Sequence, residues 1–170
     1  MTPYALTVRA KARDLRAADH LLHTLAAGLA LPRGAFGCTH LVRTGRPHIA
    51  LSLALPDEPL ARAARERLTG LGYEVTPGVP DRAGRAVIYP GVTALTGTLT
   101  VADLLARSAI DGVTVLGSPR EPAPHTPLTT RDHVRPQWRD GRLLLAAVPA
   151  AGGTLVPFEV PDPTPCCADH

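Results

Sequence analysis

The hydrophobic pattern predicts an α+β protein: a βαββαβ unit followed by a β-rich half with one short helix and a C-terminal β-meander. Three observations support this. Apolar residues alternate with a period of two near the N-terminus, two later stretches carry them at helical spacing, and an Asp-Gly and a Gly-Gly turn separate short apolar runs near the C-terminus. With 170 residues, the chain is long enough to bury a core.

The first strand and helix are indicated by local signals. Alternation over residues 4–8 predicts a half-buried strand. Apolar residues then recur at helical spacing over residues 15–29, where Asp14 is suited to the N-cap position and Pro32 ends the run. We therefore expect an amphipathic helix, with His20 and His23 facing solvent.

A hairpin and a second helix follow. Residues 38–43 and 48–55 have strand-like patterns around a Thr-Gly-Arg turn. Asp57, Glu58 and a proline then provide first-turn chemistry for a helix that ends before Gly72, and extended structure resumes over residues 73–75. The apolar stripe of that second helix comprises Leu60, Ala64, Leu68 and Leu71.

The βαββαβ order of residues 4–76 resembles the ferredoxin-like superfold. The resemblance concerns topology and implies no function, because this scaffold hosts many activities. We expect a ferredoxin-like unit over residues 1–78, a linker at 79–84, a mixed half over 85–160 and a Pro-rich tail over 161–170.

The second half mixes strands with one helix. Residues 85–89 and 113–116 are expected strands, and Thr100 is suited to begin the helix between them. The segment 117–131 holds four prolines and is the expected site loop. The turn residues Asp140-Gly141 and Gly152-Gly153 then predict a three-stranded meander, with Pro157 placing the last strand at a sheet edge.

Composition disfavours several classes of function. Lys plus Arg is 18 against 15 for Asp plus Glu, a net charge of +3, and the arginines are scattered, which disfavours nucleic-acid binding. The sequence contains no apolar stretch long enough to span a membrane and no signal-peptide pattern at its start, so we expect a cytoplasmic protein without a membrane partner. The odd count of three cysteines favours thiols or metal ligands over a disulfide framework.

The strongest chemical signal is the C-terminal sequence Cys166-Cys167-Ala-Asp-His170. Two thiols and an imidazole are ligands that zinc or copper prefers, and prolines at alternate positions before them stiffen the chain. His133 or His125 could complete the shell. We therefore expect a transition-metal site, zinc first and copper or another metal second, either as a carrier or structural site or as a Lewis acid in catalysis.

The sequence Arg131-Asp132-His133-Val-Arg135 is the second candidate region. Asp132 could orient His133 if the backbone turns, and the two arginines could bind a small anionic substrate. An ion-paired, solvated strand edge is the alternative.

Cys38 and His40 share one face of a presumed strand. They could form half of a metal site or a Cys-His nucleophile pair, although a buried thiol beside Val42 is favoured. The sequence contains no phosphate-binding loop, dinucleotide fingerprint, H-E-x-x-H or G-x-S-x-G motif.

Three functions remain open. The first is metal binding by Cys166, Cys167 and His170. The second is a metal-free enzyme in which one of these cysteines is the nucleophile, His133 activates it, and Arg131 or Arg135 holds an anionic substrate. The third is a binding or assembly module whose sheet pairs into a homodimer.

Overall fold

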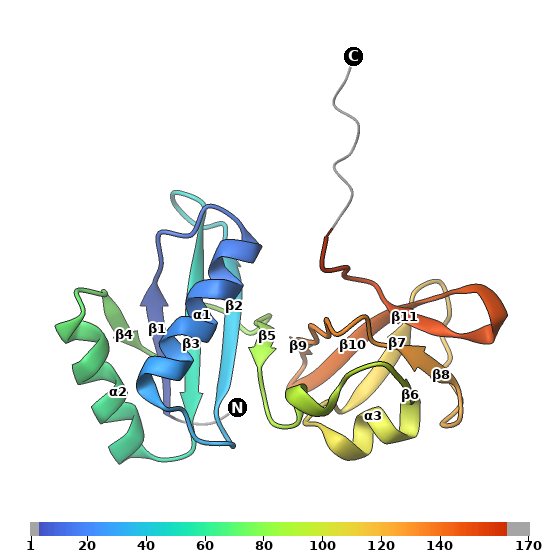
Figure 1. Cartoon of the computed structure of the whole chain (residues 1–170). Helices are drawn as coiled ribbons and strands as arrows, with labels where there is room; N and C mark the ends of the chain where they lie inside the picture. The colour runs from blue at the N-terminus through green and yellow to red at the C-terminus, as the bar shows by residue number, and fades with distance from the viewer. Residues whose placement is uncertain (1–3, 163–170) are drawn as a thin grey trace.

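The computed structural model describes residues 4–162 and shows a mixed α+β protein. Within these residues, three helices accompany one sheet of eleven strands. Figure 1 shows two lobes, which we call the N-terminal lobe (residues 4–77) and the C-terminal lobe (residues 89–162). Strand β5 (Arg85–Ile88) joins them, because it pairs with β2 on one side and β9 on the other.

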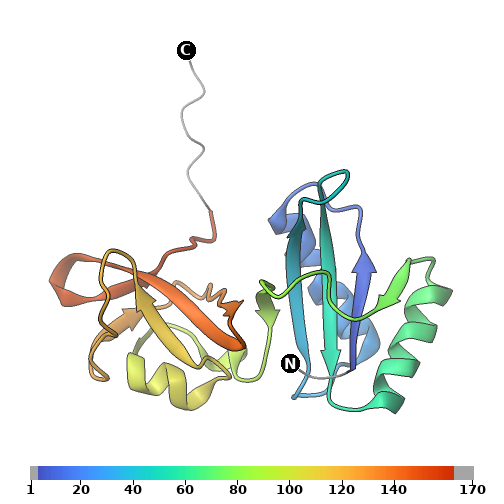
Figure 2. The same ribbon diagram turned by 180° about the vertical axis from the view of Figure 1, so that it is seen from behind.

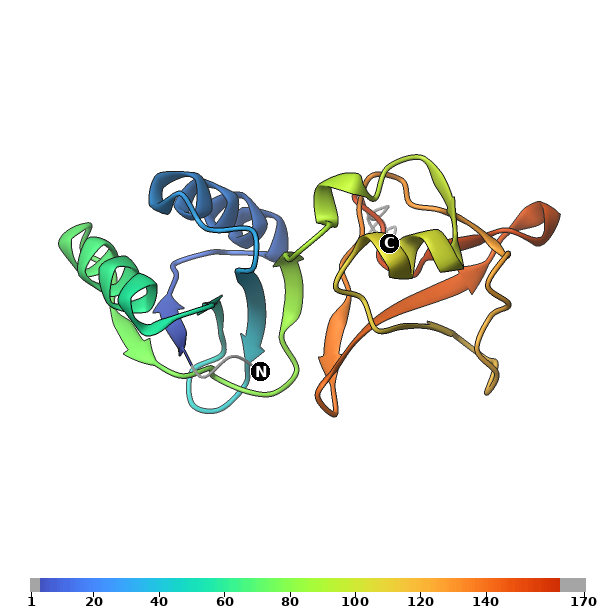
Figure 3. The ribbon, with the colours of Figure 1, turned by 90° about the horizontal axis from the view of Figure 1, so that it is seen from below.

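The N-terminal lobe has four strands and two helices. Its strands lie in the order β4-β1-β3-β2, and every neighbouring pair is antiparallel. Both helices cover the same face of this sheet (Figure 3). The elements are β1 (Tyr4–Arg9), α1 (Leu15–Leu29), β2 (Phe36–Val42), β3 (His48–Leu55), α2 (Glu58–Gly70) and β4 (Val75–Pro77).

The predicted N-cap of α1, Asp14, is confirmed, and Asp57 is the N-cap of α2. Asp14 accepts a hydrogen bond from the amide of Ala17 at 2.7 Å, and Asp57 accepts one from the amide of Leu60 at 2.9 Å. These carboxylates satisfy amides that the first turn of a helix leaves unpaired, so local sequence is enough to start both helices.

The predicted apolar stripe of α2 is only half buried. Ala64 and Leu68 face the sheet together with Ala61, whereas Leu60 and Leu71 are exposed. The core-facing arc of α2 therefore centres on Ala61, Ala64 and Leu68.

The other face of the N-terminal sheet carries the segment from residues 78 to 84, which crosses it on the way from β4 to β5 (Figure 2). The amide of Gly78 donates to the carbonyl of Ala5 at 2.7 Å, and the hydroxyl of Thr7 donates to the carbonyl of Gly78 at 2.9 Å. We call residues 78–84 the crossing segment. Small side chains on this face, such as Ala50 and Ser52, leave room for it.

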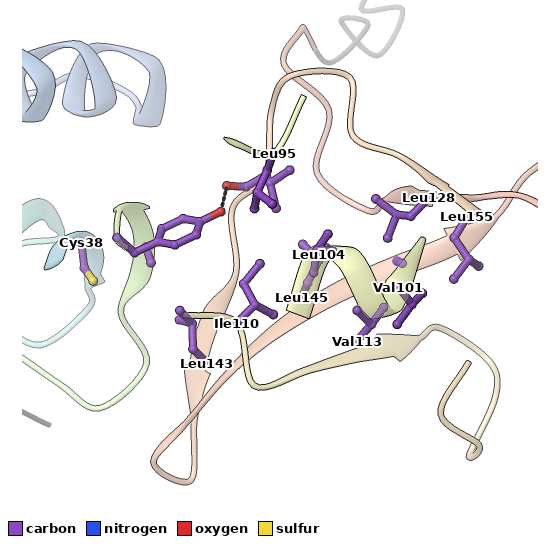
Figure 4. Packing of buried hydrophobic residues seen from close by; sticks show 14 residues of the cluster. Cys38, Leu95, Val101, Leu104, Ile110, Val113, Leu128, Leu143, Leu145 and Leu155 are labelled. Atoms are coloured by element: carbon purple, nitrogen blue, oxygen red, sulfur yellow. Dashed lines mark hydrogen bonds between the residues drawn. The ribbon is translucent and has the colours of Figure 1, made fainter. Parts of the chain in front are cut away.

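The C-terminal lobe is built around strand β10. Figure 4 shows its core, in which Leu104, Leu128, Leu143 and Leu145 are almost completely buried. The elements are β6 (Thr98–Thr100), α3 (Val101–Arg107), β7 (Gly112–Val115), β8 (Pro127–Thr129), β9 (Gln137–Arg139), β10 (Arg142–Pro149) and β11 (Leu155–Pro157), with 3-10 turns at Val92–Ala94 and Ala151–Gly153.

The Asp140-Gly141 hairpin is confirmed. Arg139 pairs with Arg142, and both turn residues have positive φ, 50° and 78°, as a two-residue type I′ turn requires. The expectation that Pro157 marks an edge is wrong, because β11 lies between β10 and β8. Strand β11 pairs with β8 only at Leu155. The missing amide hydrogen of Pro157 therefore removes no hydrogen bond between β11 and β8.

Segment 117–131, expected to be a loop, contains strand β8.

In residues 4–162, none of the helices is both long and apolar enough to cross a membrane.

Candidate functional site

Three polar side chains on the crossed face of the N-terminal sheet form a continuous hydrogen-bonded relay. Nδ1 of His40 lies 2.8 Å from Oδ1 of Asp81, and Nε2 of the same ring lies 2.7 Å from Oγ of Ser52. The His40 side chain is only 2% exposed and Ser52 is 4% exposed, whereas Asp81 reaches solvent. The relay therefore runs from the surface into a buried position.

Strand register explains why His40 and Ser52 meet. Cys38 pairs with Ser52 and His40 pairs with Ala50, so the imidazole and the hydroxyl lie diagonally across two neighbouring strands. Diagonal neighbours on one face of an antiparallel pair are within reach of a long side chain. The small Ala50 leaves the space that the imidazole ring needs.

The crossing segment supplies the carboxylate. Oδ1 of Asp81 also accepts a hydrogen bond from the amide of Ala83 at 2.9 Å, which fixes the carboxylate over the sheet. The same segment then passes so close to the imidazole that a Cβ on Gly84 would lie 2.8 Å from Cε1 of His40. Glycine at position 84 is thus a requirement of this close approach.

The hydrogen-bond partners of His40 favour one tautomer of its neutral ring. A carboxylate can only accept, so Nδ1–H of His40 donates to Asp81, and in the neutral ring Nε2 accepts the hydroxyl proton of Ser52. This arrangement aligns Ser52 for transfer of its proton to the imidazole. Asp81 would stabilise the imidazolium that forms.

A cavity of about 170 Å³ adjoins the relay. The polar residues that line it are His40, Ser52, Asp81 and Arg82. The rings of Phe36 and Trp138 contact each other with centroids 5.6 Å apart and bring β9 of the C-terminal lobe into the wall. The remaining lining is mostly apolar: Cys38, Ala54, Val79 and the backbone of Gly84.

Cys38 is a poor nucleophile in this setting. Burial raises the pKa of its thiol to about 12. The thiol therefore stays protonated at neutral pH and contributes volume and polarizability to the wall. Cys38 is buried, as the sequence predicted. The hydrogen-bond partners of the neighbouring His40 ring are Ser52 and Asp81.

A second polar cluster joins the two lobes, and we call it the interlobe network. Arg85 of β5 binds Asp19 of α1 through two hydrogen bonds of 2.6 and 3.0 Å, and its Nε donates to Glu159 at 2.8 Å. Arg135 donates to Asp19 at 3.1 Å, and Nε2 of His133 lies 3.0 Å from Glu159. Arg85 is only 7% exposed.

Charges in the interlobe network balance. Burial raises the pKa values of Asp19 and Glu159, but hydrogen bonds and charge from Arg85 outweigh it, with help from Arg135 and His133, and leave both values lowered. Two carboxylates thus face two guanidiniums. This internal pairing fits a structural joint between the lobes, because the charges that could bind a substrate already bind each other.

The predicted candidates around His133 separate. His133 and Arg135 belong to the interlobe network, whereas Arg131 is exposed. The backbone does turn, with φ of 54° and 53° at Arg131 and Asp132, but the Asp132 carboxylate accepts a hydrogen bond from the amide of Gly97 at 3.0 Å. Its observed role is therefore to hold a loop.

The predicted metal ligands lie mostly beyond the structure. Cys166, Cys167 and His170 fall outside residues 4–162, and His125 is exposed in the segment before β8. Among the residues that the structure describes, no three His, Cys, Asp or Glu side chains are grouped to hold a metal ion.

Sequence reasoning missed Ser52 and Asp81. One signal was present for Ser52, because it is the single hydroxyl in the otherwise apolar run from Ile49 to Leu55. No local signal marks Asp81, which lies 41 residues after His40 and reaches it only through the path of the crossing segment.

This chain matches no protein-family model, no curated protein and no solved structure.

Proposed function

We propose that the cavity beside Ser52 is the site of an acyl-transfer reaction, most simply the hydrolysis of a small carboxylic ester or thioester. The observation that carries the proposal is the relay itself, in which the two nitrogens of His40 contact Asp81 and Ser52 at 2.8 and 2.7 Å. A serine, a base and an orienting carboxylate in this order define a nucleophile by geometry, whatever their order in the chain.

In the proposed reaction, Oγ of Ser52 attacks the carbonyl carbon of the substrate and its proton passes to Nε2 of His40. The tetrahedral intermediate collapses when the leaving alcohol or thiol takes that proton, which leaves an acyl-Ser52 ester. Water then attacks this ester, gives its proton to His40, and releases the acid while Ser52 regains a proton. Asp81 holds the ring orientation in both halves.

The cavity limits the substrate. Its volume of about 170 Å³ corresponds to roughly five or six water molecules, so a short acyl group fits and a long chain does not. The apolar wall of Phe36, Ala54 and Trp138 favours a hydrocarbon group. Arg82, which also lines the cavity, offers positive charge for the developing oxyanion.

The first test is covalent labelling with a fluorophosphonate, followed by peptide mass spectrometry. We expect a single adduct on Ser52, which is absent in Ser52→Ala and strongly reduced in Asp81→Asn. Hydrolysis of p-nitrophenyl acetate should fall at least about a thousandfold in Ser52→Ala. Ser118→Ala, which removes an exposed hydroxyl far from the relay in sequence, is the matched control.

A second variant tests geometry without removing a functional group. Gly84→Ala places a methyl group 2.8 Å from Cε1 of His40 and should displace the ring from Ser52. We expect slower labelling of Ser52 with a circular dichroism spectrum like that of the unmodified protein. If Ser52 is unlabelled, or if Ser52→Ala lowers only the stability, the relay serves to anchor the crossing segment and the proposed reaction is wrong.

Metal binding at the C-terminus is a separate proposal. Its support is the ligand chemistry of Cys166, Cys167 and His170, which suits zinc first and copper second. Cys166 follows Glu159 by seven residues, so an extended chain reaches about 23 Å from the point where Glu159 meets His133. His133 is thus within reach as a fourth ligand.

Elemental analysis tests this second proposal. Protein purified without chelator or affinity tag should carry about one metal per chain, and a truncation that ends at Pro165 should lose it. Absence of metal in both proteins after reconstitution under reducing conditions would refute it. Thiol catalysis by Cys166 or Cys167 is a further prediction, which labelling with iodoacetamide and an activity assay of the same truncation would test.

We also infer that residues 4–77 form a ferredoxin-like unit. The strand order β4-β1-β3-β2 and the position of both helices on one face support this inference. The division into units at 79–84, the cytoplasmic location, the homodimer and an anionic ligand at Arg131 or Arg135 stay predictions.

A further inference from the structure

A second hollow lies at the end of the N-terminal sheet where β1 ends and the β2–β3 hairpin turns. Two adjoining depressions of about 810 and 300 Å³ share four residues there, Arg9, Arg46, His48 and Glu74. Lys11 and Tyr73 also line the larger depression. We call these six residues and the space between them the basic groove.

Positive charge is in excess in the basic groove. Arg9, Lys11 and Arg46 face a single carboxylate, Glu74, which pairs with Arg9 at 3.5 Å. Within residues 4–162, Lys11 and Arg46 form no salt bridge. Cations gathered in one concave surface repel each other and raise the local concentration of anions.

Three separate segments build the basic groove. Arg9 and Lys11 come from the end of β1 and the residues after it, and Arg46 comes from the β2–β3 turn. Nδ1–H of His48 donates to the carbonyl of Arg46 at 3.0 Å, which fixes that turn next to the start of β3. Tyr73 and Glu74 enter just after the end of α2. The cations are therefore placed by the fold and not by one flexible tail.

The lining combines charge with apolar surface. Tyr73 and Leu21 are half-buried walls of the larger depression, and Pro47 adds a rigid apolar edge. An arginine fork binds phosphate oxygens in a planar, two-point manner, and a lysine adds a compact charge. Aromatic and aliphatic walls beside them favour a ligand that carries a flat or hydrocarbon group.

We propose that the basic groove binds a small phosphate ester, with its phosphoryl group between Lys11 and Arg46 and its apolar group against Tyr73 and Leu21. This binding site is independent of the reaction proposed at Ser52. Neither Ser52 nor Asp81 lines it.

Isothermal titration calorimetry with phenyl phosphate tests the proposal, with inorganic phosphate and phenol as the two partial ligands. We expect phenyl phosphate to bind more tightly than either, and increasing salt to weaken it. The double variant Lys11→Gln/Arg46→Gln should bind at least about tenfold more weakly, as expected for loss of charge-assisted hydrogen bonds. Arg65→Gln/Arg120→Gln removes the same charge from exposed positions elsewhere and should bind as the unmodified protein does.

Amide chemical shifts locate the binding. Changes on addition of phenyl phosphate should concentrate at the end of β1, at the start of β3 and around Tyr73. Equal affinity for inorganic phosphate and phenyl phosphate would overturn the assignment of an ester. Equal weakening in both double variants, or tighter binding of a short oligonucleotide than of phenyl phosphate, would overturn the site itself.

Discussion

Replacement of Arg85 by methionine should be among the most damaging single changes in this protein. Arg85 is 7% exposed and binds Asp19, Glu159 and the hydroxyl of Thr39. Methionine fills a similar volume but leaves two carboxylates short of their main partner. Removal of one member of a buried ion pair costs about 3–5 kcal/mol, because the remaining charge stays buried without compensation.

The lower end of that range applies here. Asp19 keeps Arg135 at 3.1 Å, and Glu159 keeps His133 at 3.0 Å, so neither carboxylate loses every partner. Glu159 is also partly open to water. We therefore expect a loss of about 3 kcal/mol in the free energy of unfolding at pH 7.

Urea unfolding measures this loss. The single tryptophan, Trp138, reports on β9 beside β5, and far-ultraviolet circular dichroism reports on the helices. With a slope of about 2 kcal/mol per molar urea, the midpoint should fall by about 1.5 M. Because Arg85 joins the lobes, the midpoints from both signals should fall together in the variant.

The matched control is Arg65→Met, which removes an exposed arginine of α2 and should change the free energy of unfolding by less than about 0.5 kcal/mol. A loss below about 1 kcal/mol in Arg85→Met, or one equal to that of the control, would refute the view that Arg85 holds the lobes together.

Two further predictions concern acid and backbone geometry. The pKa values of Asp19 and Glu159 are lowered from 3.8 and 4.5, so their contribution to stability is complete above these ordinary values and is lost as the pH falls through the lower folded values. Urea midpoints should therefore fall steeply below about pH 4.5, and unchanged midpoints down to pH 3 would contradict this. Gly91→Ala should cost about 2–3 kcal/mol in the same assay, because φ is 85° and the new Cβ would lie 1.9 Å from the carbonyl oxygen of the last residue of α3. Gly97→Ala, with φ of 63° but open space, is the control, and equal losses would show that contact is unimportant.

Much of the fold was readable locally. Helix α1 begins after Asp14 and the Asp140-Gly141 turn joins β9 to β10, as their sequences predict. Capping and turn preferences act over three or four residues, so neighbouring side chains alone decide them. The edge assignment of Pro157 failed because strand order depends on partners distant in the sequence.

The candidate site shows the same division. Alternation placed Cys38 and His40 on one face, but it could not show what faces them. Ser52 meets His40 through strand register, and Asp81 meets it because the crossing segment runs over the sheet. Both contacts with His40 depend on how the whole N-terminal lobe packs.

By itself, the sequence determined where α1 and the Asp140-Gly141 turn begin and that Cys38 and His40 share one face of a strand. Only the tertiary structure decided that His40 links Ser52 to Asp81 and that Arg85 meets Asp19 and Glu159. The physical reason is distance along the chain. Local backbone preferences act within a few residues, whereas these contacts join residues up to 74 positions apart. They therefore form only when the strands and helices pack together.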